Sequence, residues 1–172
     1  DLNYAQADAK AFTDKIVEQN KGIFKAIHKT EIYDTDATRG NILKGFKSII
    51  AKAKAEDVFV FYYAGHGTID EETGGGFYLV PTEVTKLYGD PEQYKKCISD
   101  EELKNSLTMV KAQKQVVLMD ACHSGAAVAN MKVGAAASDE KAIVTLARSS
   151  GVVILASSGT KQFAAEFDQL QH

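Results

Sequence analysis

VFVFYYAGHG, residues 58–67, and QVVLMDACHSG, residues 115–125, decide the fold of this chain. Each is an apolar run that ends in a turn of small residues. Their length and their content of Val, Phe, Tyr or Leu are typical of strands that are buried on both faces. The first run ends at His66 and the second at Cys122. If the two strands are parallel neighbours, both residues lie at the carboxyl edge of one sheet, where open α/β proteins bind their ligands.

Helical and strand patterns alternate around these two runs. The expected helices are residues 4–20, a helix that starts within residues 34–41 and continues through Ala55, residues 139–148, and a helix that Ser99 and Glu102 begin with a capping box. The other expected strands are residues 22–33, 77–81 and 151–158, and the expected loops are 68–76, 83–98 and 126–137. This alternation favours an α/β fold in which a mostly parallel central sheet carries helices on both faces.

The composition is that of one ordinary globular domain. The 172 residues are 45% hydrophobic and 25% charged, with a net charge of −3. Charges of both signs are interspersed, so no basic face for nucleic acid is expected, and no apolar run is long enough to span a membrane. Cys97 and Cys122 form no CxxC pair, which favours a reducing, cytoplasmic location over a disulfide framework. Cys97 lies in a polar stretch and is interpreted as a partly buried thiol without a catalytic role.

His66 and Cys122 have the chemistry of a thiol protease. The thiolate is the nucleophile, and a histidine within hydrogen-bond reach takes the thiol proton and returns it to the leaving amine. Gly65 and Gly67 flank His66 and let a substrate backbone approach the ring. The N–H groups of Gly67 and Cys122 are candidate donors to the oxyanion, and loss of one such donor lowers the rate by about 10²–10³.

Each motif alone has a simpler explanation. A histidine between glycines is more often a turn residue, and a cysteine after a strand is more often a small buried hydrophobe. Their joint occurrence at two strand ends favours a catalytic dyad. His123 is the rival base, but it directly follows Cys122 and is expected to point away from the thiol. The only potential metal ligands that cluster here are Asp120, Cys122 and His123. A zinc site needs three or four convergent ligands, and the strand would scatter these three, so no metal site is expected.

The two motifs also resemble those of a known family. YYAGHG and DACHSG resemble the His and Cys motifs of the caspase-like cysteine peptidases, in the metacaspase and bacterial orthocaspase branch. DLNYAQADAKAF, DATRGNI and ILASSGTKQFAAE resemble further segments of that family, so the resemblance covers nearly the whole chain. It implies a three-layer caspase-like fold, with His66 as base, Cys122 as nucleophile, and the Gly67 and Cys122 amides as oxyanion donors.

The resemblance also bears on substrate preference. In metacaspase-like members, the acids that match Asp8 and Asp120 line the first specificity pocket. Two carboxylates favour a cation, and a guanidinium pairs with them best, so cleavage after Arg or Lys is expected. Many members have a serine where this chain has Ala64, which removes one hydrogen bond from the substrate-binding pocket. The simpler interpretation of Asp8 is a solvated helix residue.

Several expectations concern cofactors, partners and chain ends. No cofactor is required, although Asp70, Glu71 and Glu72 leave weak Ca²⁺ binding open. Residues 1–172 are interpreted as one peptidase domain of the large-subunit type, without its first strand and its C-terminal segment. A small-subunit chain or that segment would complete the fold, and Lys132 is the best internal site for self-cleavage. The expected partner is a protein or peptide substrate. The alternative function is a catalytically silent caspase-like module for binding or scaffolding.

Overall fold

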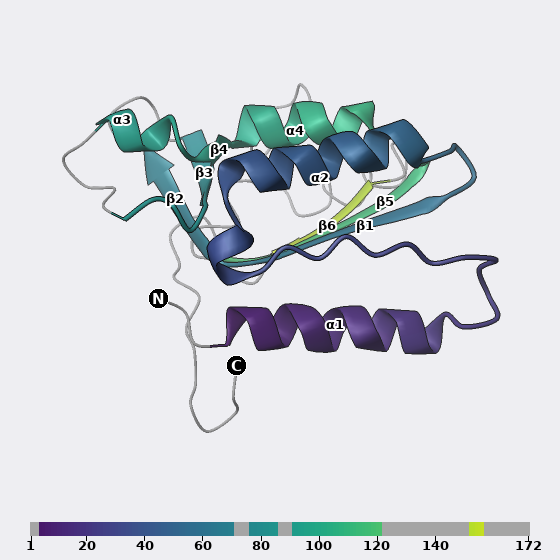
Figure 1. The fold of residues 1–172 in the computed structure, drawn as a ribbon. Coiled ribbons are helices and arrows are strands. Elements are labelled where there is room, and N and C mark those ends of the chain that lie inside the picture. The colour runs from purple at the N-terminus through teal and green to yellow at the C-terminus, as the bar shows by residue number, and fades with distance from the viewer. Residues whose placement is uncertain (1–3, 71–75, 86–90, 122–151, 157–172) are drawn as a thin grey trace.

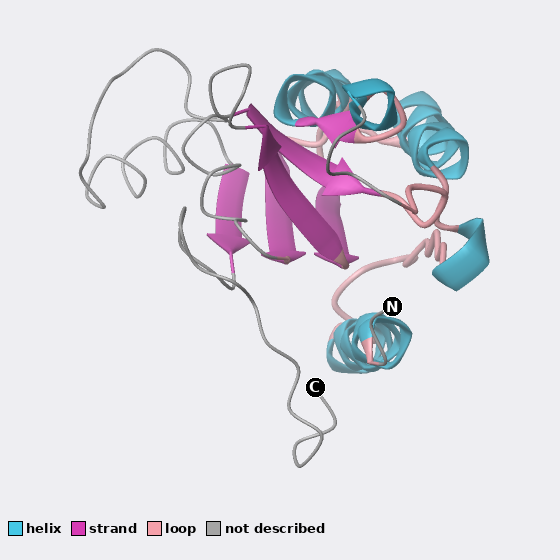
Figure 2. Ribbon diagram, turned by 90° about the vertical axis from the view of Figure 1, so that its left-hand side faces the viewer, coloured by secondary structure: helices cyan, strands magenta, loops and turns pink. Residues whose placement is uncertain are grey.

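A three-stranded parallel sheet forms the centre of the molecule. The computed structural model describes residues 4–70, 76–85, 91–121 and 152–156. Within them, β1 (Val58–Ala64), β5 (Lys114–Asp120) and β6 (Val152–Ala156) pair in the order β1-β5-β6. Helix α1 (Ala5–Gln19) lies on one face, and α2 (Arg39–Lys52) and α4 (Asp100–Met109) lie on the other (Figures 1 and 2). The expected three-layer α/β architecture is confirmed.

Alternate residues of β1 face different helices. Phe59 and Phe61 point toward α2, where their ring centroids lie 6.3 Å and 5.2 Å from that of Phe46. Tyr62 points the other way and stacks on Phe12 of α1, with the ring centroids 4.6 Å apart. Successive side chains of a strand leave opposite faces of the sheet. These aromatic contacts therefore hold α1 and α2 on opposite sides of the same strand.

The hydrophobic core fills the space between the sheet and the α2/α4 layer. Its most deeply buried members come from β3 (Gly76–Val80), β4 (Ile98–Ser99), β5 and α4: Phe77, Leu79, Ile98, Leu103, Val117 and Met119. Burial of one such side chain contributes about 1.5–3 kcal/mol. In contrast, α1 has no buried residue. The core layer on the α2/α4 side therefore supplies most of the hydrophobic stabilisation of the described residues.

Helix α4 starts at the expected cap. The Ser99 side chain accepts a hydrogen bond from the Glu102 N–H at 3.2 Å, and Glu102 Oε2 accepts one from the Ser99 N–H at 3.4 Å. This confirms the capping box. At the start of α2, Arg39 donates to the Cys97 carbonyl at 3.1 Å and pairs with the Glu102 carboxylate. The first turns of α2 and α4 are thereby joined.

A second, antiparallel sheet lies beyond the carboxyl ends of β1 and β5 (Figure 1). Its strands are β2 (His66–Asp70), β3 (Gly76–Val80) and β4 (Ile98–Ser99), in the order β2-β3-β4. The loop expected over 68–76 therefore gives up its first residues to β2. The loop expected over 83–98 contains the four-residue helix α3 (Pro91–Tyr94) and loses its last residue to β4. The residues that the two expected loops lose to β2 and β4 are in strands because β3 pairs with a strand on each side.

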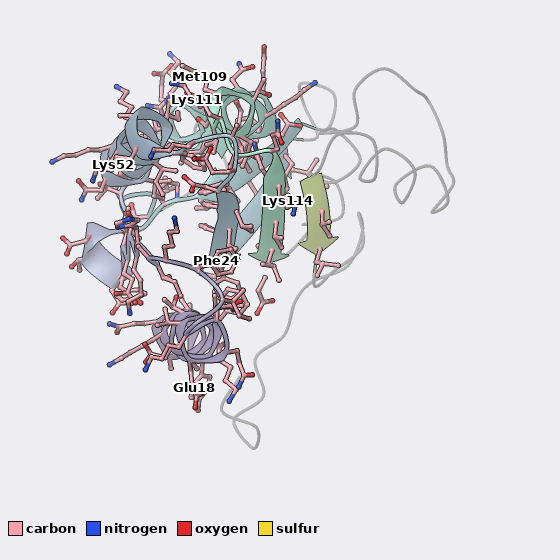
Figure 3. The ribbon with its side chains drawn as sticks, turned by 90° about the vertical axis from the view of Figure 1, so that its right-hand side faces the viewer. Glu18, Phe24, Lys52, Met109, Lys111 and Lys114 are labelled. Carbon is pink, nitrogen blue, oxygen red and sulfur yellow. The ribbon has the colours of Figure 1, made fainter. Side chains whose placement is uncertain are left out.

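The prediction of a strand over residues 22–33 is wrong. After an isolated bridge between Lys21 and Phe24, this segment has no regular structure before the short 3₁₀ turn at Asp34–Asp36. Three of its apolar side chains are exposed, with Ile23 at 71%, Phe24 at 42% and Ile27 at 37%. In the view of Figure 3, Phe24 lies between α1 and the strands. A strand needs a hydrogen-bonding partner, and among the described residues no strand pairs with this segment.

The remaining expectations divide into confirmed and undescribed elements. The helix expected over 4–20 matches α1, and the strand expected over 151–158 matches β6. The helix expected to start within residues 34–41 and to continue through Ala55 matches α2. The expected loop 126–137 and helix 139–148 lie outside the described residues. None of the helices described is both long and apolar enough to cross a bilayer.

Candidate active site

The strands that carry the two motifs end together at one edge of the sheet. β1 and β5 are parallel neighbours, and their register pairs Ala64 with Asp120. Just beyond that pair, the Gly65 N–H donates to the Asp120 carbonyl at 3.0 Å. The expectation that these strands are adjacent and parallel is confirmed. Cys122 follows Asp120 by two positions but lies outside the described residues, so its approach to His66 stays a prediction.

This edge is the end of the molecule next to the antiparallel sheet. Figure 3 shows the opposite end, where Lys52, Lys111 and Lys114 lie near the ends of α2 and α4 and the start of β5. The candidate site thus occupies the carboxyl ends of the parallel strands, which is where open α/β sheets place their ligand-binding residues.

His66 is the first residue of β2 rather than the last of β1. It is exposed and pairs with Val80 across the β2–β3 hairpin, and Gly67 pairs with Leu79. The Tyr63 hydroxyl lies 2.9 Å from the His66 carbonyl oxygen and 3.2 Å from that of Val80, and it donates toward both. The side chain of Tyr63 therefore holds the backbone carbonyl of His66 from the core side of the sheet. The role of Gly67 as an oxyanion donor stays a prediction.

Gly65 has a packing role that the sequence interpretation did not assign. A Cβ atom at this position would lie 2.7 Å from both Cζ and Oη of Tyr63. That separation is far below a van der Waals contact, so a side chain at residue 65 would displace the tyrosine ring. Gly65 is thus required for the chain to pass over Tyr63 on its way to His66.

The two candidate pocket acids act on the same tyrosine. Asp8 lies in the first turn of α1, Asp120 ends β5, and both are half-buried. The pKa of Tyr62 is raised to about 12, first by burial and then by the negative charges of Asp120 and Asp8. Since Tyr62 and Ala64 leave the same face of β1, the structure brings both acids and Ala64 to the α1 side of the sheet edge. Their role in substrate binding stays a prediction.

Sequence reasoning missed Tyr62 and Tyr63 as site residues. A signal was present in the two-residue period of β1, because it assigns Tyr62 to the face of Ala64 and Tyr63 to the opposite face. The pairing of Ala64 with Asp120 then completes the assignment. That register could not be read from the sequence with certainty, because two apolar runs can pair in more than one alignment.

Cys97 is a buried thiol on the core side. Its side chain is 1% exposed, and its Sγ lies 3.6 Å from the Gln93 carbonyl oxygen. Burial raises the pKa of the Cys97 thiol to about 11, with a smaller contribution from the charge of Glu83. An activated thiol needs the opposite shift. The interpretation of Cys97 as a structural residue therefore agrees with its surroundings.

The structure leaves the proposed Ca²⁺ loop untested. Among the residues described, no group of three or more His, Cys, Asp or Glu side chains is placed to hold a metal ion. Asp70 ends β2, while Glu71 and Glu72 lie outside the described residues. Weak Ca²⁺ binding by this loop stays a prediction.

Comparison with known proteins decides the family. Residues 2–131 match the model of the family described as metacaspase, peptidase C14 domain, and this range includes both motifs. The chain belongs to this metacaspase family. The metacaspase match confirms the resemblance drawn from the sequence and identifies a caspase-like peptidase domain.

A solved structure agrees with the fold. The chain is similar to the crystal structure of a Geobacter sulfurreducens protein determined as a structural genomics target, with 23% sequence identity and a TM-score of 0.54. The match covers 72% of this chain and 43% of the Geobacter chain, so this metacaspase chain spans less than half the length of that protein. At this identity the likeness concerns the fold alone. No curated protein matches the chain significantly.

Proposed function

We propose that this metacaspase domain belongs to a cysteine endopeptidase that cleaves peptide bonds after Arg or Lys. His66 is the base, Cys122 is the nucleophile, and the N–H groups of Gly67 and Cys122 bind the oxyanion. The observation that supports this most strongly is the parallel register of β1 and β5, in which Ala64 pairs with Asp120. It ends the two motif-bearing strands at the same edge.

The proposed reaction has two proton transfers around one covalent intermediate. The Cys122 thiol gives its proton to His66, and the thiolate sulfur attacks the scissile carbonyl carbon. The carbonyl oxygen becomes an oxyanion that the two backbone N–H groups stabilise. As the C–N bond breaks, His66 returns the proton to the leaving amine. Water then hydrolyses the thioester and restores the thiol.

The proposed preference for a cation rests on the charges at the sheet edge. Asp8 and Asp120 both act on the Tyr62 hydroxyl, so two carboxylates lie within electrostatic reach of one point. With a pKa of about 12, Tyr62 is neutral at physiological pH and adds no charge of its own. Ala64 leaves the same strand face without a hydrogen-bonding group. A carboxylate pair bordered by neutral groups suits the guanidinium of Arg, which binds carboxylates in a bidentate manner.

A matched pair of peptides tests the specificity. The peptides differ only in Arg or citrulline before a fluorogenic leaving group, and citrulline keeps the shape while losing the charge. We expect kcat/KM for Arg to exceed that for citrulline by about 10–100-fold, since hydrogen bonds to charged groups contribute about 1.5–3 kcal/mol. Asp120→Asn should remove most of this ratio. Equal turnover of the two peptides by the unmodified protein would reject the carboxylate pocket.

Three variants test the catalytic assignment separately from specificity. Cys122→Ala and His66→Ala should abolish turnover of the Arg peptide, whereas Cys97→Ala should retain it. Each assay is run with Ca²⁺ and with a chelator, because the acidic loop leaves calcium activation open. Full activity in Cys122→Ala would exclude this nucleophile. Absence of turnover in all conditions, with Cys122 no more reactive than Cys97, would favour the silent binding module.

A further inference from the structure

We propose that Tyr63 is a positioning residue for the oxyanion site: its hydroxyl fixes the peptide unit that joins His66 to Gly67. This inference rests on the proposed function, in which the Gly67 N–H stabilises the oxyanion. Tyr63 touches neither substrate nor nucleophile in this proposal. It acts from the core side of β1, through the backbone.

The side chain of Tyr63 is anchored in the hydrophobic core. It leaves the same face of β1 as Phe59 and Phe61 and packs against the buried cluster with them. Burial raises the pKa of its phenol well above the usual value. The hydroxyl therefore stays protonated throughout the working pH range and is always available as a donor. A rigid ring with a permanent donor is suited to holding a backbone group in place.

The Tyr63 hydroxyl binds the carbonyl end of the peptide unit that joins His66 to Gly67. It lies 2.9 Å from the His66 carbonyl oxygen and 3.2 Å from the carbonyl oxygen of the register partner, Val80. The carbonyl of His66 and the N–H of Gly67 belong to the same planar peptide group. In a trans peptide these two bonds point in opposite directions, and no peptide in the described chain is cis. Fixing the carbonyl toward the core therefore fixes the N–H in the opposite direction.

The preceding peptide is fixed as well. The Gly65 N–H donates to the Asp120 carbonyl at 3.0 Å, which ties this point of the chain to the end of β5. Gly65 also passes so close over the Tyr63 ring that a Cβ would lie 2.7 Å from Oη. The backbone between β1 and β2 is thus held at successive residues, by β5 at Gly65 and by Tyr63 at His66. Removal of the hydroxyl loses the second of these contacts, and the pairing of His66 with Val80 in the β2–β3 ladder remains.

Hydrogen bonding to the carbonyl has an electronic effect in the same direction. A peptide group whose oxygen accepts a hydrogen bond is polarised, and its N–H becomes a better donor through cooperativity. The Tyr63 hydroxyl thus both aims the Gly67 N–H and strengthens it. Both effects matter most in the transition state, when negative charge has developed on the substrate oxygen.

Tyr63→Phe tests the inference because it removes Oη and keeps the ring. We expect kcat for the Arg peptide to fall about 10–100-fold with KM unchanged, which is less than complete loss of one oxyanion donor. A peptide aldehyde ending in Arg provides the second measurement, because its hemithioacetal with Cys122 places an oxygen in the oxyanion site. Its Ki should rise by the same factor as kcat falls. Gly65→Ala, which displaces the ring, should change kcat and Ki in the same way.

Two further measurements separate positioning from a structural defect. The rate and pH dependence of Cys122 alkylation by iodoacetamide should not change, because alkylation forms no oxyanion. Tyr33→Phe is the matched control, since it removes a tyrosine hydroxyl that bonds to Glu31 at 2.8 Å on the segment before α2. It should leave kcat and Ki unaltered. All variants are assayed below their melting temperatures.

The outcomes distinguish this inference from the proposed function. If Cys122→Ala is inactive while Tyr63→Phe keeps the kcat and aldehyde Ki of the unmodified protein, only the role of Tyr63 is overturned. A Tyr63→Phe variant with altered alkylation kinetics and unchanged aldehyde Ki also contradicts it. If the unmodified protein cleaves no Arg peptide, or Cys122→Ala remains active, the proposed function fails and the inference fails with it.

Discussion

Cys97 should be almost inert to alkylation in the folded protein, which makes the reactivity of Cys122 measurable in the same sample. The buried thiol has its pKa raised from 9.0 to about 11. At pH 7.5 its thiolate fraction is then about 0.03%, against about 3% for the unshifted thiol, and the thiolate is the reacting form. The pKa alone therefore predicts a rate roughly 100-fold lower. Its 1% exposure lowers the rate further, because the reagent must wait for local opening.

The assay compares two tryptic peptides after timed reaction with iodoacetamide. Cys97 is recovered in residues 97–104 and Cys122 in residues 115–132. In urea both cysteines should react at similar rates, and this provides the internal reference. In buffer the Cys97 peptide should be modified at least 100-fold more slowly than in urea. The Cys122 peptide should react faster than in urea if His66 promotes its ionisation.

The pH dependence gives a second check with a definite sign. Because the folded pKa of Cys97 lies above the unfolded value, folding favours the protonated thiol. The stability from this group is complete below about pH 9 and is lost as the pH rises through 11. Alkylation of Cys97 should accelerate over the same range. Reaction of native Cys97 at pH 7.5 within a few fold of its rate in urea would refute both its burial and its raised pKa.

Three further predictions concern the caps, the core and the acids. Ser99→Ala removes the capping box of α4 and should lower stability by about 1 kcal/mol, or Tm by about 2–4 °C, in a circular dichroism melt; an unchanged Tm would contradict it. Leu103→Ala, at a fully buried position, should cost about 2–5 kcal/mol in urea unfolding, and a loss below 1 kcal/mol would show that the site is not packed as described. Asp120→Asn should lower the pKa of Tyr62 from about 12, since one negative charge that raises it is removed. An unchanged Tyr62 pKa in a titration of tyrosinate absorbance would show that the charge of Asp120 does not act on Tyr62.

The parallel core of the fold could be predicted because its strands carry a strong local signal. β1 and β5 are continuous apolar runs, and few arrangements other than the interior of a parallel sheet bury them. The same holds for α4, where Ser99 and Glu102 mark the start and Leu103 the inward face. In each case the residues that define the element also determine what it packs against.

The strand expected over 22–33 failed because strand formation depends on a partner. Its alternating pattern is compatible with a strand, but no described strand offers it an edge with the necessary hydrogen bonds, and Ile23 and Phe24 remain exposed. The reverse error occurred at residues 68–70. These residues form part of β2 only because the neighbouring β3 accepts their hydrogen bonds. Both errors involve pairing over a distance, which a local pattern does not encode.

The candidate site was predictable in its motifs and not in its supporting residues. His66 and Asp120 are marked by their sequence neighbours, whereas the hydroxyl of Tyr63 acquires its role from the turn of the backbone at Gly65. The effect of Asp8 on Tyr62 depends on where α1 lies across the sheet. Contacts of this kind arise from tertiary packing. They become visible only when the elements are placed in space.

The alternation of β1 links the stability of the core to the geometry of the site. Tyr62 and Tyr63 are adjacent in sequence, yet one faces the two acids and the other holds the backbone of His66. A slip of one residue in β1 would exchange their faces and move Asp120 away from Ala64. It would also turn Phe61 out of its contact with α2. Burial of aromatic side chains on the core face therefore opposes such a slip, and the same packing that stabilises the sheet keeps the acids and the His66–Gly67 peptide in register.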